Sequence, residues 1–214
     1  MSDLDGHTIA LLDDDPFALE SMALIIDSFP DCRVLWRTQD AKQAIDRCLT
    51  PSDRPDVLLL DMSLGLGWSG VDVCASIRRR TDAVPVLAIT SFPVHRYSKT
   101  AALAGAQGIV SKSDRTQMAS ALRTVANGGT WGDMFDNALI SHIRLRQQPQ
   151  QAMLSQKEST VMNMLVTGSS VSDVAETMQC SESTVKSFLS RAKKKLGAST
   201  LRKAIALWTG ESNE

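Results

Sequence analysis

The sequence predicts an α/β doubly wound domain with a five-stranded parallel sheet, followed by a C-terminal four-helix domain that contains a helix-turn-helix. Three observations lead to this prediction. Up to about residue 128, short apolar runs of strand length alternate with amphipathic helical stretches. Beyond a polar stretch near residue 150, the pattern is entirely helical. The length of 214 residues also fits two small domains, at about 100–200 residues per domain.

Five short apolar runs are the predicted strands. The first, third and fourth are almost continuously apolar, as parallel strands with both faces buried should be. Their ranges are Ile9–Leu12, Val34–Trp36, Val57–Leu60, Val84–Ile89 and Gly108–Val110. Helices are predicted between them, where apolar side chains recur at 3.6-residue spacing. Such faces comprise Ala18, Met22, Ile25 and Phe29, then Ala41, Ala44, Ile45 and Cys48, and later Met118, Ala121, Leu122 and Val125.

The pattern divides the chain into a first domain over 1–131, a linker over 132–152 and a second domain over 153–214. The linker is polar at residues 147–151, and a short helix is predicted within it at Ala138–Leu145. The second domain opens with a capping box from Ser155 to Glu158. The turn at Gln179-Cys180 between two short helices has the spacing of a helix-turn-helix.

Charge and composition exclude several classes of protein. The chain is 43% hydrophobic and 22% charged, which argues against disorder, and its net charge is -1. Residues 1–132 carry 13 Lys/Arg against 16 Asp/Glu, whereas residues 150–214 carry 8 against 6. There is no membrane-spanning apolar run, and the acidic N-terminus is unlike a signal peptide. The four cysteines lack metal-site spacing. We therefore expect a cytoplasmic protein with reduced thiols and no membrane partner.

Chemically reactive residues follow four of the predicted strands. The first run ends in Asp13 and Asp14, the third in Asp61 and the fourth in Thr90, and Lys112 follows the fifth. In a parallel sheet these positions meet at one edge. Clustered carboxylates repel one another unless a divalent cation neutralises them, and Mg²⁺ prefers such oxygen ligands. Carboxylates, a hydroxyl and an ammonium are also the groups that phosphoryl transfer requires, with one Asp attacking phosphorus.

The stretch from Ser181 to Leu196 predicts a DNA-facing helix. It contains no acidic residue after position 182. Lys and Arg neutralise phosphates, and small side chains let a helix approach base edges in the major groove. The N-terminal part of the second helix of a helix-turn-helix reads bases, which makes Lys186, Ser187 and Ser190 the candidate base readers. The candidate phosphate contacts are Thr184, Arg191 and Lys194. Phe188 is open to two interpretations, packing beneath the helix or contact with a thymine methyl group.

Residues 7–129 resemble the receiver domain of bacterial two-component response regulators, which has a flavodoxin-like fold. The resemblance rests on the stretches LLDDDP, PDVLLLDMSL, VPVLAITS and GAQGIVSK. It implies that Asp13, Asp14, Asp61 and the backbone carbonyl of Ser63 bind Mg²⁺. It also implies that Asp61 accepts phosphoryl from a sensor histidine kinase, that Thr90 senses it and that Lys112 binds it.

Residues 154–208 resemble the LuxR-type helix-turn-helix of NarL/FixJ regulators, through LSQKE and SESTVKSFLSRAKKKLG. The two resemblances together imply a phosphorylation-controlled, DNA-binding transcription regulator. Such a protein is no enzyme beyond the phosphorylation and slow dephosphorylation of its own Asp61. Two-fold dimers on repeated half-sites follow from helix-turn-helix geometry, so we expect a homodimer in the active state.

Three positions depart from the receiver pattern. Asp15 stands where this subfamily usually has His, and the segment at 65–70 is one residue longer than the usual loop. Ile109 occupies the position of the usual switch Tyr or Phe, and an aliphatic side chain cannot reproduce the inward rotation of an aromatic ring. This keeps an alternative open, in which the protein binds DNA independently of phosphorylation and the receiver is only a dimerisation platform.

A second alternative is a phosphohydrolase of haloacid-dehalogenase type. The residues Asp13-Asp14-Asp15 read D-x-D after the first strand, so Asp13 would be the nucleophile and Asp15 the general acid. Against this interpretation, Pro16 follows where that family favours Thr or Val, and no acidic pair follows Lys112. A helical DNA-binding module is also an unusual partner for such an enzyme.

Overall fold

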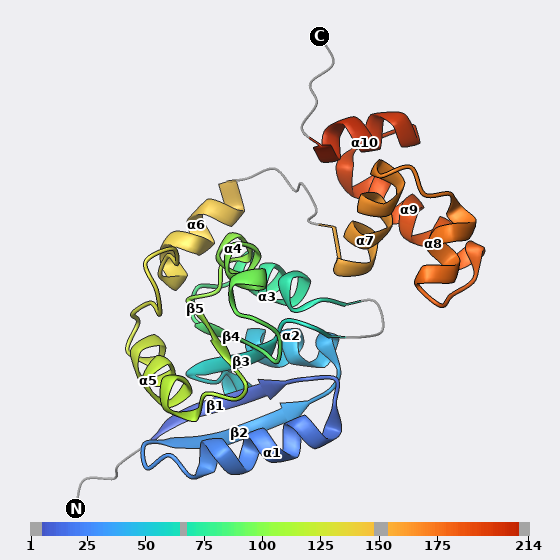
Figure 1. The fold of residues 1–214 in the computed structure, drawn as a ribbon. Helices are drawn as coiled ribbons and strands as arrows, with labels where there is room; N and C mark the ends of the chain where they lie inside the picture. The colour runs from blue at the N-terminus through green and yellow to red at the C-terminus, as the bar shows by residue number, and fades with distance from the viewer. Residues whose placement is uncertain (1–5, 65–67, 148–153, 210–214) are drawn as a thin grey trace, which may run out of the picture. The chain divides into compact units, whose positions relative to one another are not determined.

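A computed structural model describes residues 6–64, 68–147 and 154–209 of the chain. The chain separates into two compact units, residues 1–148 and 149–214. The first is a parallel sheet covered by helices on both faces, and the second is helical (Figure 1).

The sheet of the first unit has the strand order β2-β1-β3-β4-β5, with every neighbouring pair parallel. Its strands are β1 (His7–Leu12), β2 (Cys32–Thr38), β3 (Val57–Asp61), β4 (Val86–Thr90) and β5 (Gly108–Ser111). All residues of β3 and β4 are buried, which explains why their sequences are apolar without alternation. The predicted doubly wound, five-stranded parallel sheet is confirmed.

Helices follow each strand and cover both faces of the sheet. They are α1 (Pro16–Asp27), α2 (Ala41–Leu49), α3 (Gly70–Arg78), α4 (His95–Ala104) and α5 (Arg115–Ala126). The side chains of Asp15, Asp40 and Asp114 cap the first backbone N–H groups of α1, α2 and α5. A single-turn 3-10 helix, η1 (Pro51–Asp53), separates α2 from β3.

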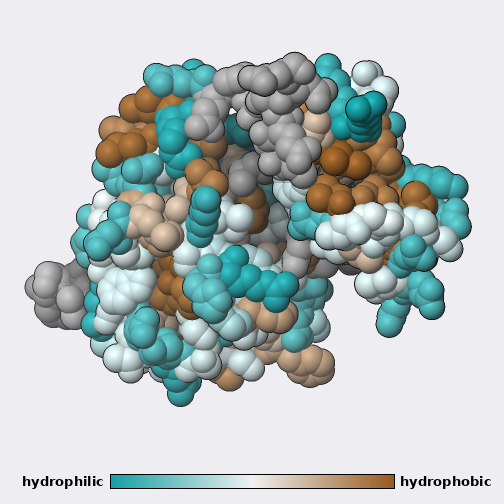
Figure 2. Space-filling model, turned by 45° about the horizontal axis from the view of Figure 1, so that its top comes forward, coloured by the Kyte–Doolittle hydropathy of each residue, from teal (hydrophilic) through white to brown (hydrophobic). Residues whose placement is uncertain are grey.

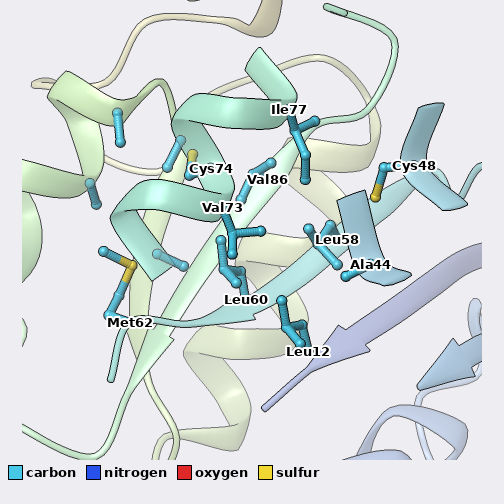
Figure 3. Close-up of a cluster of buried hydrophobic side chains, with 14 of the residues drawn as sticks. Leu12, Ala44, Cys48, Leu58, Leu60, Met62, Val73, Cys74, Ile77 and Val86 are labelled. Atoms are coloured by element: carbon cyan, nitrogen blue, oxygen red, sulfur yellow. The ribbon is translucent and has the colours of Figure 1, made fainter. Parts of the chain in front are cut away.

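Two hydrophobic clusters lie on opposite faces of the sheet. One joins side chains of the sheet to α1 and α5, and includes Ile26 and Leu122. The other joins the sheet to α2, α3 and α4, and Figure 3 shows Val73 and Ile77 of α3 packed towards Leu60 and the other strand residues. These clusters hold the strand ends in fixed positions relative to one another, which the site described below requires.

A sixth helix, α6 (Ala138–Gln147), packs on the first unit. Leu145 and Ser141 are buried, and Arg144 donates hydrogen bonds to the carbonyls of Leu103 and Ala102 at the end of α4. The helix predicted at 138–145 therefore exists. Residues 132–147, which the sequence prediction places in a partly helical linker, belong to the first unit. Other apolar side chains of α6 are exposed, those of Leu139, Ile140 and Ile143. The brown areas of Figure 2 show that apolar residues also reach the surface elsewhere in the chain.

The described part of the second unit comprises four helices: α7 (Gln156–Val166), α8 (Val171–Thr177), α9 (Glu182–Leu196) and α10 (Leu201–Thr209). Capping boxes begin α7 at Ser155 and α8 at Ser170. The turn between α8 and α9 places Gln179 at a φ of 51°, in the left-handed region. Val174 and Val185 lie in the core that these two helices share with α7, so the predicted helix-turn-helix is confirmed.

Candidate functional site

The carboxyl ends of the parallel strands bring the predicted site residues of the first unit together. Asp13 follows β1, Asp61 ends β3, Thr90 ends β4 and Lys112 follows β5. Asp13, Asp61 and Thr90 are all buried, with exposed fractions of 3% or less. Ligand oxygens of Asp13, Asp14 and Asp61 lie within 4.8 Å of one another. These groups therefore form one pocket at the sheet edge.

Lys112 lies between two of the carboxylates. Its Nζ is 2.5 Å from Oδ2 of Asp13 and 3.2 Å from Oδ1 of Asp61. The other oxygen of Asp61 accepts a hydrogen bond of 3.2 Å from the backbone N–H of Ser63. The Oδ1 atom of Asp61 is buried and has this ion pair but no hydrogen bond of regular geometry. One oxygen of the carboxylate is thus held by the loop, and the other faces the lysine.

The electrostatics of the pocket reflect burial among like charges. Burial raises the pKa of the Asp61 carboxyl, the Lys112 ammonium lowers it and the charge of Asp13 raises it further, so the net shift is upward. For Lys112, burial lowers the pKa, but its interactions with Asp13 and Asp61 outweigh that effect and raise it. The lysine stays protonated, and the three carboxylates of the group exceed its charge. A divalent cation fits this set of oxygen donors, because it offsets the excess negative charge.

Gly70 positions the loop after Asp61, a role that its sequence context did not reveal. A Cβ atom at Gly70 would lie 2.3 Å from the carbonyl oxygen of Asp61 and 2.7 Å from Cα of Met62. Only glycine lets the first turn of α3 approach the backbone that closely. The capping box of Ser69 and Asp72 begins the helix at the same point. The expectation of a longer loop concerns residues 65–70, and residues 65–67 lie outside the described part.

The remaining departures have defined places in the structure. Asp15 is exposed, and its carboxylate accepts a hydrogen bond from the N–H of Phe17 as the cap of α1. It therefore has a structural partner, and it is outside the group of three carboxylates that could hold a metal. Ile109 is buried at 5% exposure within the cluster beneath α2, α3 and α4. The aliphatic side chain at the switch position is thus a core residue.

Helix α9 of the second unit presents the predicted DNA-facing residues on its outer side. Ser190 and Lys194 are exposed, and Thr184 is half-buried. Lys186 and Ser187 are also exposed and make local contacts, Lys186 with Glu182 at 3.2 Å and Ser187 with the carbonyl of Ser183 at 2.9 Å. Because each contact is made within one helical turn of α9, the side chains of Lys186 and Ser187 stay at the surface.

Two residues of this helix have roles in packing. Phe188 is buried at 7% exposure in the core of the second unit, which settles its alternatives in favour of packing. The guanidinium carbon of exposed Arg191 lies 4.9 Å from the centre of the Phe188 ring. Trp208 in α10 packs against a further cluster of the second unit that includes Met162 and Ala192, and its indole N–H donates a hydrogen bond to Asn163.

Glu158 is a buried carboxylate of the second unit that sequence reasoning identified only as a helix cap. It is 2% exposed and accepts a hydrogen bond of 2.8 Å from the backbone N–H of Ser155. The ammonium of Lys195 lies 2.8 Å from the same carboxylate, and Arg191 lies 3.9 Å from it. Glu158 therefore ties the start of α7 to the last turns of α9.

Family models match both units. The model described as "Response regulator receiver domain" matches residues 9–123, which is more than half of the chain. The model described as "Bacterial regulatory proteins, luxR family" matches residues 152–208. None of the described helices combines the length and apolar character that crossing a membrane requires.

Similar proteins match over most of the chain. The DNA-binding transcriptional activator EvgA of Escherichia coli K12 is 28% identical over 193 residues, covering 89% of this chain and 92% of the relative. DevR/DosR, a DNA-binding transcriptional activator of Mycobacterium tuberculosis, is 29% identical over 196 residues, covering 88% of both chains. A structure of the response regulator RcsB with DNA has a TM-score of 0.55 at 20% identity, covering 97% of this chain and all of the other. A structure of RcsB from Salmonella enterica serovar Typhimurium, bound to a promoter in the presence of phosphomimetic BeF3⁻, has a TM-score of 0.53 at 21% identity and covers 97% and 100%.

Proposed function

We propose that Asp61 is the phosphoryl acceptor of this chain, which belongs to the two-component response regulators of the NarL/FixJ type. Membership of this family makes the chain a phosphorylation-controlled, DNA-binding transcription regulator. The observation that carries the proposal is the position of the buried Asp61 carboxylate, 3.2 Å from the ammonium of Lys112 and within 4.8 Å of the carboxylate oxygens of Asp13 and Asp14. The Asp61 carboxylate also accepts a hydrogen bond of 3.2 Å from the backbone N–H of Ser63, as the Asp13 carboxylate accepts one of 3.1 Å from the N–H of Asp15.

Phosphoryl transfer to Asp61 joins one carboxylate oxygen to phosphorus. The P–N bond of a kinase phosphohistidine breaks as the new P–O bond forms, and its electron pair leaves with the imidazole. Lys112 then neutralises a phosphoryl oxygen, and the hydroxyl of Thr90 binds another. We propose the same roles when a small acyl phosphate replaces the kinase. The only catalysis expected of the chain is this self-phosphorylation and the slow hydrolysis of the product.

We propose that Mg²⁺ binds to Asp13, Asp14, Asp61 and the backbone carbonyl of Ser63. The donor set fits, because the three carboxylates bring oxygens within 4.8 Å of one another and exceed the charge of Lys112. The ion supplies positive charge to the phosphoryl oxygens when it is bound. A cation held by Asp13 would compete with Lys112 for that carboxylate, so the lysine would be available to the phosphoryl group.

In the second unit, we propose that the outer side of α9 enters the major groove. Lys186, Ser187 and Ser190 would read base edges, and this proposal is supported by their exposure near the N-terminal half of the helix. Lys194, Arg191 and Thr184 would contact phosphates. Arg191 also stacks on Phe188 and lies near Glu158, so its contact with DNA would be made from a partly fixed side chain.

The proposed partners are DNA, a sensor histidine kinase and a second copy of the chain. A helix-turn-helix that binds two half-sites does so as a two-fold dimer, which supports a homodimer in the active state. The proposed place of action is the cytoplasm, because DNA is the target.

One titration tests both halves of the proposal. Binding of the full chain to DNA from upstream of its own gene is measured by gel shift, with and without a small acyl phosphate and Mg²⁺. We expect tighter binding with the donor, and neither tighter binding nor a labelled acyl phosphate in Asp61→Asn. Asp133→Asn, an exposed acid of the same unit, is the matched control and should behave as the unmodified chain does.

The alternatives correspond to other outcomes of the same experiment. Equal DNA binding with and without the donor, despite labelling of Asp61, would support a receiver that serves only as a dimerisation platform. The burial of aliphatic Ile109 at the switch position is the observation that favours this second candidate. Turnover of a generic phosphate ester would support a phosphohydrolase using Asp13, and we expect none.

A further inference from the structure

The two loops that flank the proposed acceptor both reach one aromatic side chain, that of Tyr97 in the first turn of α4. From the first loop, Oγ of Ser63 lies 2.9 Å from the hydroxyl of Tyr97, and the backbone N–H of Ser63 donates to Asp61. From the second loop, Oγ1 of Thr90 accepts a hydrogen bond of 3.0 Å from the N–H of Phe92. The Phe92 ring lies 6.3 Å from that of Tyr97, at an interplanar angle of 55°. Both loops thus connect the pocket to Tyr97, the first directly through Ser63 and the second through Phe92.

Tyr97 is suited to respond to both loops because it is buried. It is 8% exposed and lies in the same hydrophobic cluster as Ile109. The guanidinium carbon of Arg96 lies 5.3 Å from the centre of the Phe92 ring and 5.9 Å from that of Tyr97, which adds cation-π attraction. Ile109 has no polar group with which to contact the pocket. The polar contact between the pocket and α4 is therefore the one that the Tyr97 hydroxyl makes with Ser63.

The opposite end of α4 is bonded to the helix that leads towards the second unit. Arg144 of α6 donates hydrogen bonds of 3.0 Å and 2.9 Å to the carbonyls of Leu103 and Ala102 in the last turn of α4. The ring of His142 lies 2.6 Å from the carbonyl of Arg78, at the end of α3. A displacement of α4 along its axis would thus be passed to α6 through charged hydrogen bonds.

We propose that Tyr97 is the positioning residue that couples the state of Asp61 to α4 and, through Arg144, to α6. This inference rests on the proposed function of Asp61. In the unphosphorylated chain, the Ser63–Tyr97 hydrogen bond and the Phe92–Tyr97 ring contact hold the start of α4 against the two loops. Phosphorylation adds oxygens that can take the Ser63 N–H from the carboxylate oxygen of Asp61 and can accept a hydrogen bond from the hydroxyl of Thr90, whose Oγ1 accepts from the Phe92 N–H. Both loops then move away from their resting contacts, and the start of α4 is released.

Tyr97 is the single tyrosine of the chain, which permits a direct spectroscopic test. Incorporation of 3-fluorotyrosine gives one fluorine resonance from the full-length protein. We expect this resonance to shift when an acyl phosphate and Mg²⁺ are added, and to stay in place in Asp61→Asn. An unmoved resonance in a chain whose Asp61 carries labelled phosphoryl would overturn the proposal while leaving the acceptor assignment intact. A chain that takes up no label would overturn both.

A double-mutant cycle separates coupling from simple packing. Tyr97→Phe keeps the ring in the core and removes only the hydroxyl, and Ser63→Ala removes the partner. The quantity measured is the ratio of DNA affinities with and without the phosphodonor. Each variant should change this ratio about fivefold, the effect of one neutral hydrogen bond of roughly 1 kcal/mol, and the double variant should show no larger change.

The matched control is Ser113→Ala, which removes one hydroxyl from a 2.8 Å contact between Ser111 and Ser113 beside Lys112. Its affinity ratio should equal that of the unmodified chain. Additive effects of Tyr97→Phe and Ser63→Ala, or an unchanged ratio in Tyr97→Phe, would refute the coupling. Loss of phosphorylation in Tyr97→Phe would also refute it, because the hydroxyl would then act in the pocket itself.

Discussion

The ammonium of Lys112 lies closer to Asp13, at 2.5 Å, than to the proposed acceptor Asp61, at 3.2 Å. The resting lysine thus neutralises a residue that is proposed to bind the metal. Because the two contacts share one ammonium, any cation that binds Asp13 changes the interaction of Lys112 with Asp61. Two predictions follow from this arrangement, one about metal binding and one about pH.

Magnesium should stabilise the first unit through the acidic pocket. A ligand that binds only the folded chain adds about 1.4 kcal/mol at ten times its dissociation constant. Thermal unfolding should therefore shift upward by a few degrees on addition of MgCl₂, measured against KCl of equal ionic strength. Asp13→Asn should lose the shift, and Asp133→Asn, with its exposed side chain, should keep it. An equal shift in all three proteins would place the ion elsewhere.

Asp61→Asn should be more stable than the unmodified chain at neutral pH without metal. Burial raises the pKa of Asp61 above its ordinary value of 3.8, so the folded chain favours the protonated form. The stability linked to this proton is present below pH 3.8 and is lost as the pH rises through the folded-state pKa. The neutral amide avoids that loss, and its advantage in thermal midpoint should shrink as the pH is lowered towards 4. A less stable Asp61→Asn at pH 7 would contradict the sign of the shift.

Gly70→Ala should disturb the acceptor loop. The added Cβ would overlap the backbone of Asp61 and Met62, so the loop or α3 must move, at a cost of about 1–3 kcal/mol. We expect a lower unfolding midpoint and slower labelling by an acyl phosphate. Gly128→Ala is the control, because it has open space but a φ of 81°, and it should lose stability without slower labelling. Equal labelling rates in both variants would show that the loop accommodates the methyl group.

Glu158→Ala should destabilise the second unit selectively. The change leaves the N–H of Ser155 without its acceptor and Lys195 without its carboxylate, at a cost of about 2 kcal/mol for charged hydrogen bonds. Hydrogen exchange measured peptide by peptide in the full chain should report faster exchange in 154–209 and unchanged exchange in 68–147. Glu176→Ala, at an exposed position of α8, should leave exchange in the second unit unchanged.

Lys186→Ala should weaken specific DNA binding about tenfold, which corresponds to one base contact of roughly 1–3 kcal/mol. Affinity for the specific site and for unrelated DNA is measured over a range of salt concentrations. Loss of a base contact lowers specificity, whereas loss of a phosphate contact reduces the salt slope by about one without changing specificity. Lys203→Ala in α10 removes the same charge from another exposed position and should affect specific binding less. Equal losses in the two variants would argue against placing Lys186 in the groove.

The sequence alone predicted most of the architecture, because burial on both faces leaves a clear signature. The continuous apolar runs of β3 and β4 could hardly be anything but interior parallel strands, and their order brought the polar strand ends to one edge. The attachment of the predicted linker helix to the first unit could not be predicted in this way. The segment that forms α6 lacks a strong amphipathic pattern, and its attachment to α4 through Arg144 depends on carbonyls some forty residues away in the sequence.

What the amino-acid sequence determined by itself was therefore the set of elements, the residues at the strand ends and the outward side of α9. All of these follow from local periodicity and from chain direction in a parallel sheet. Only the tertiary structure decided that Lys112 rests on Asp13, that Gly70 touches the backbone of Asp61 and that Ser63 meets Tyr97. These are contacts between side chains or backbones distant in sequence. Their geometry depends on how the helices pack on the sheet. A periodic pattern within one segment contains no information about that packing.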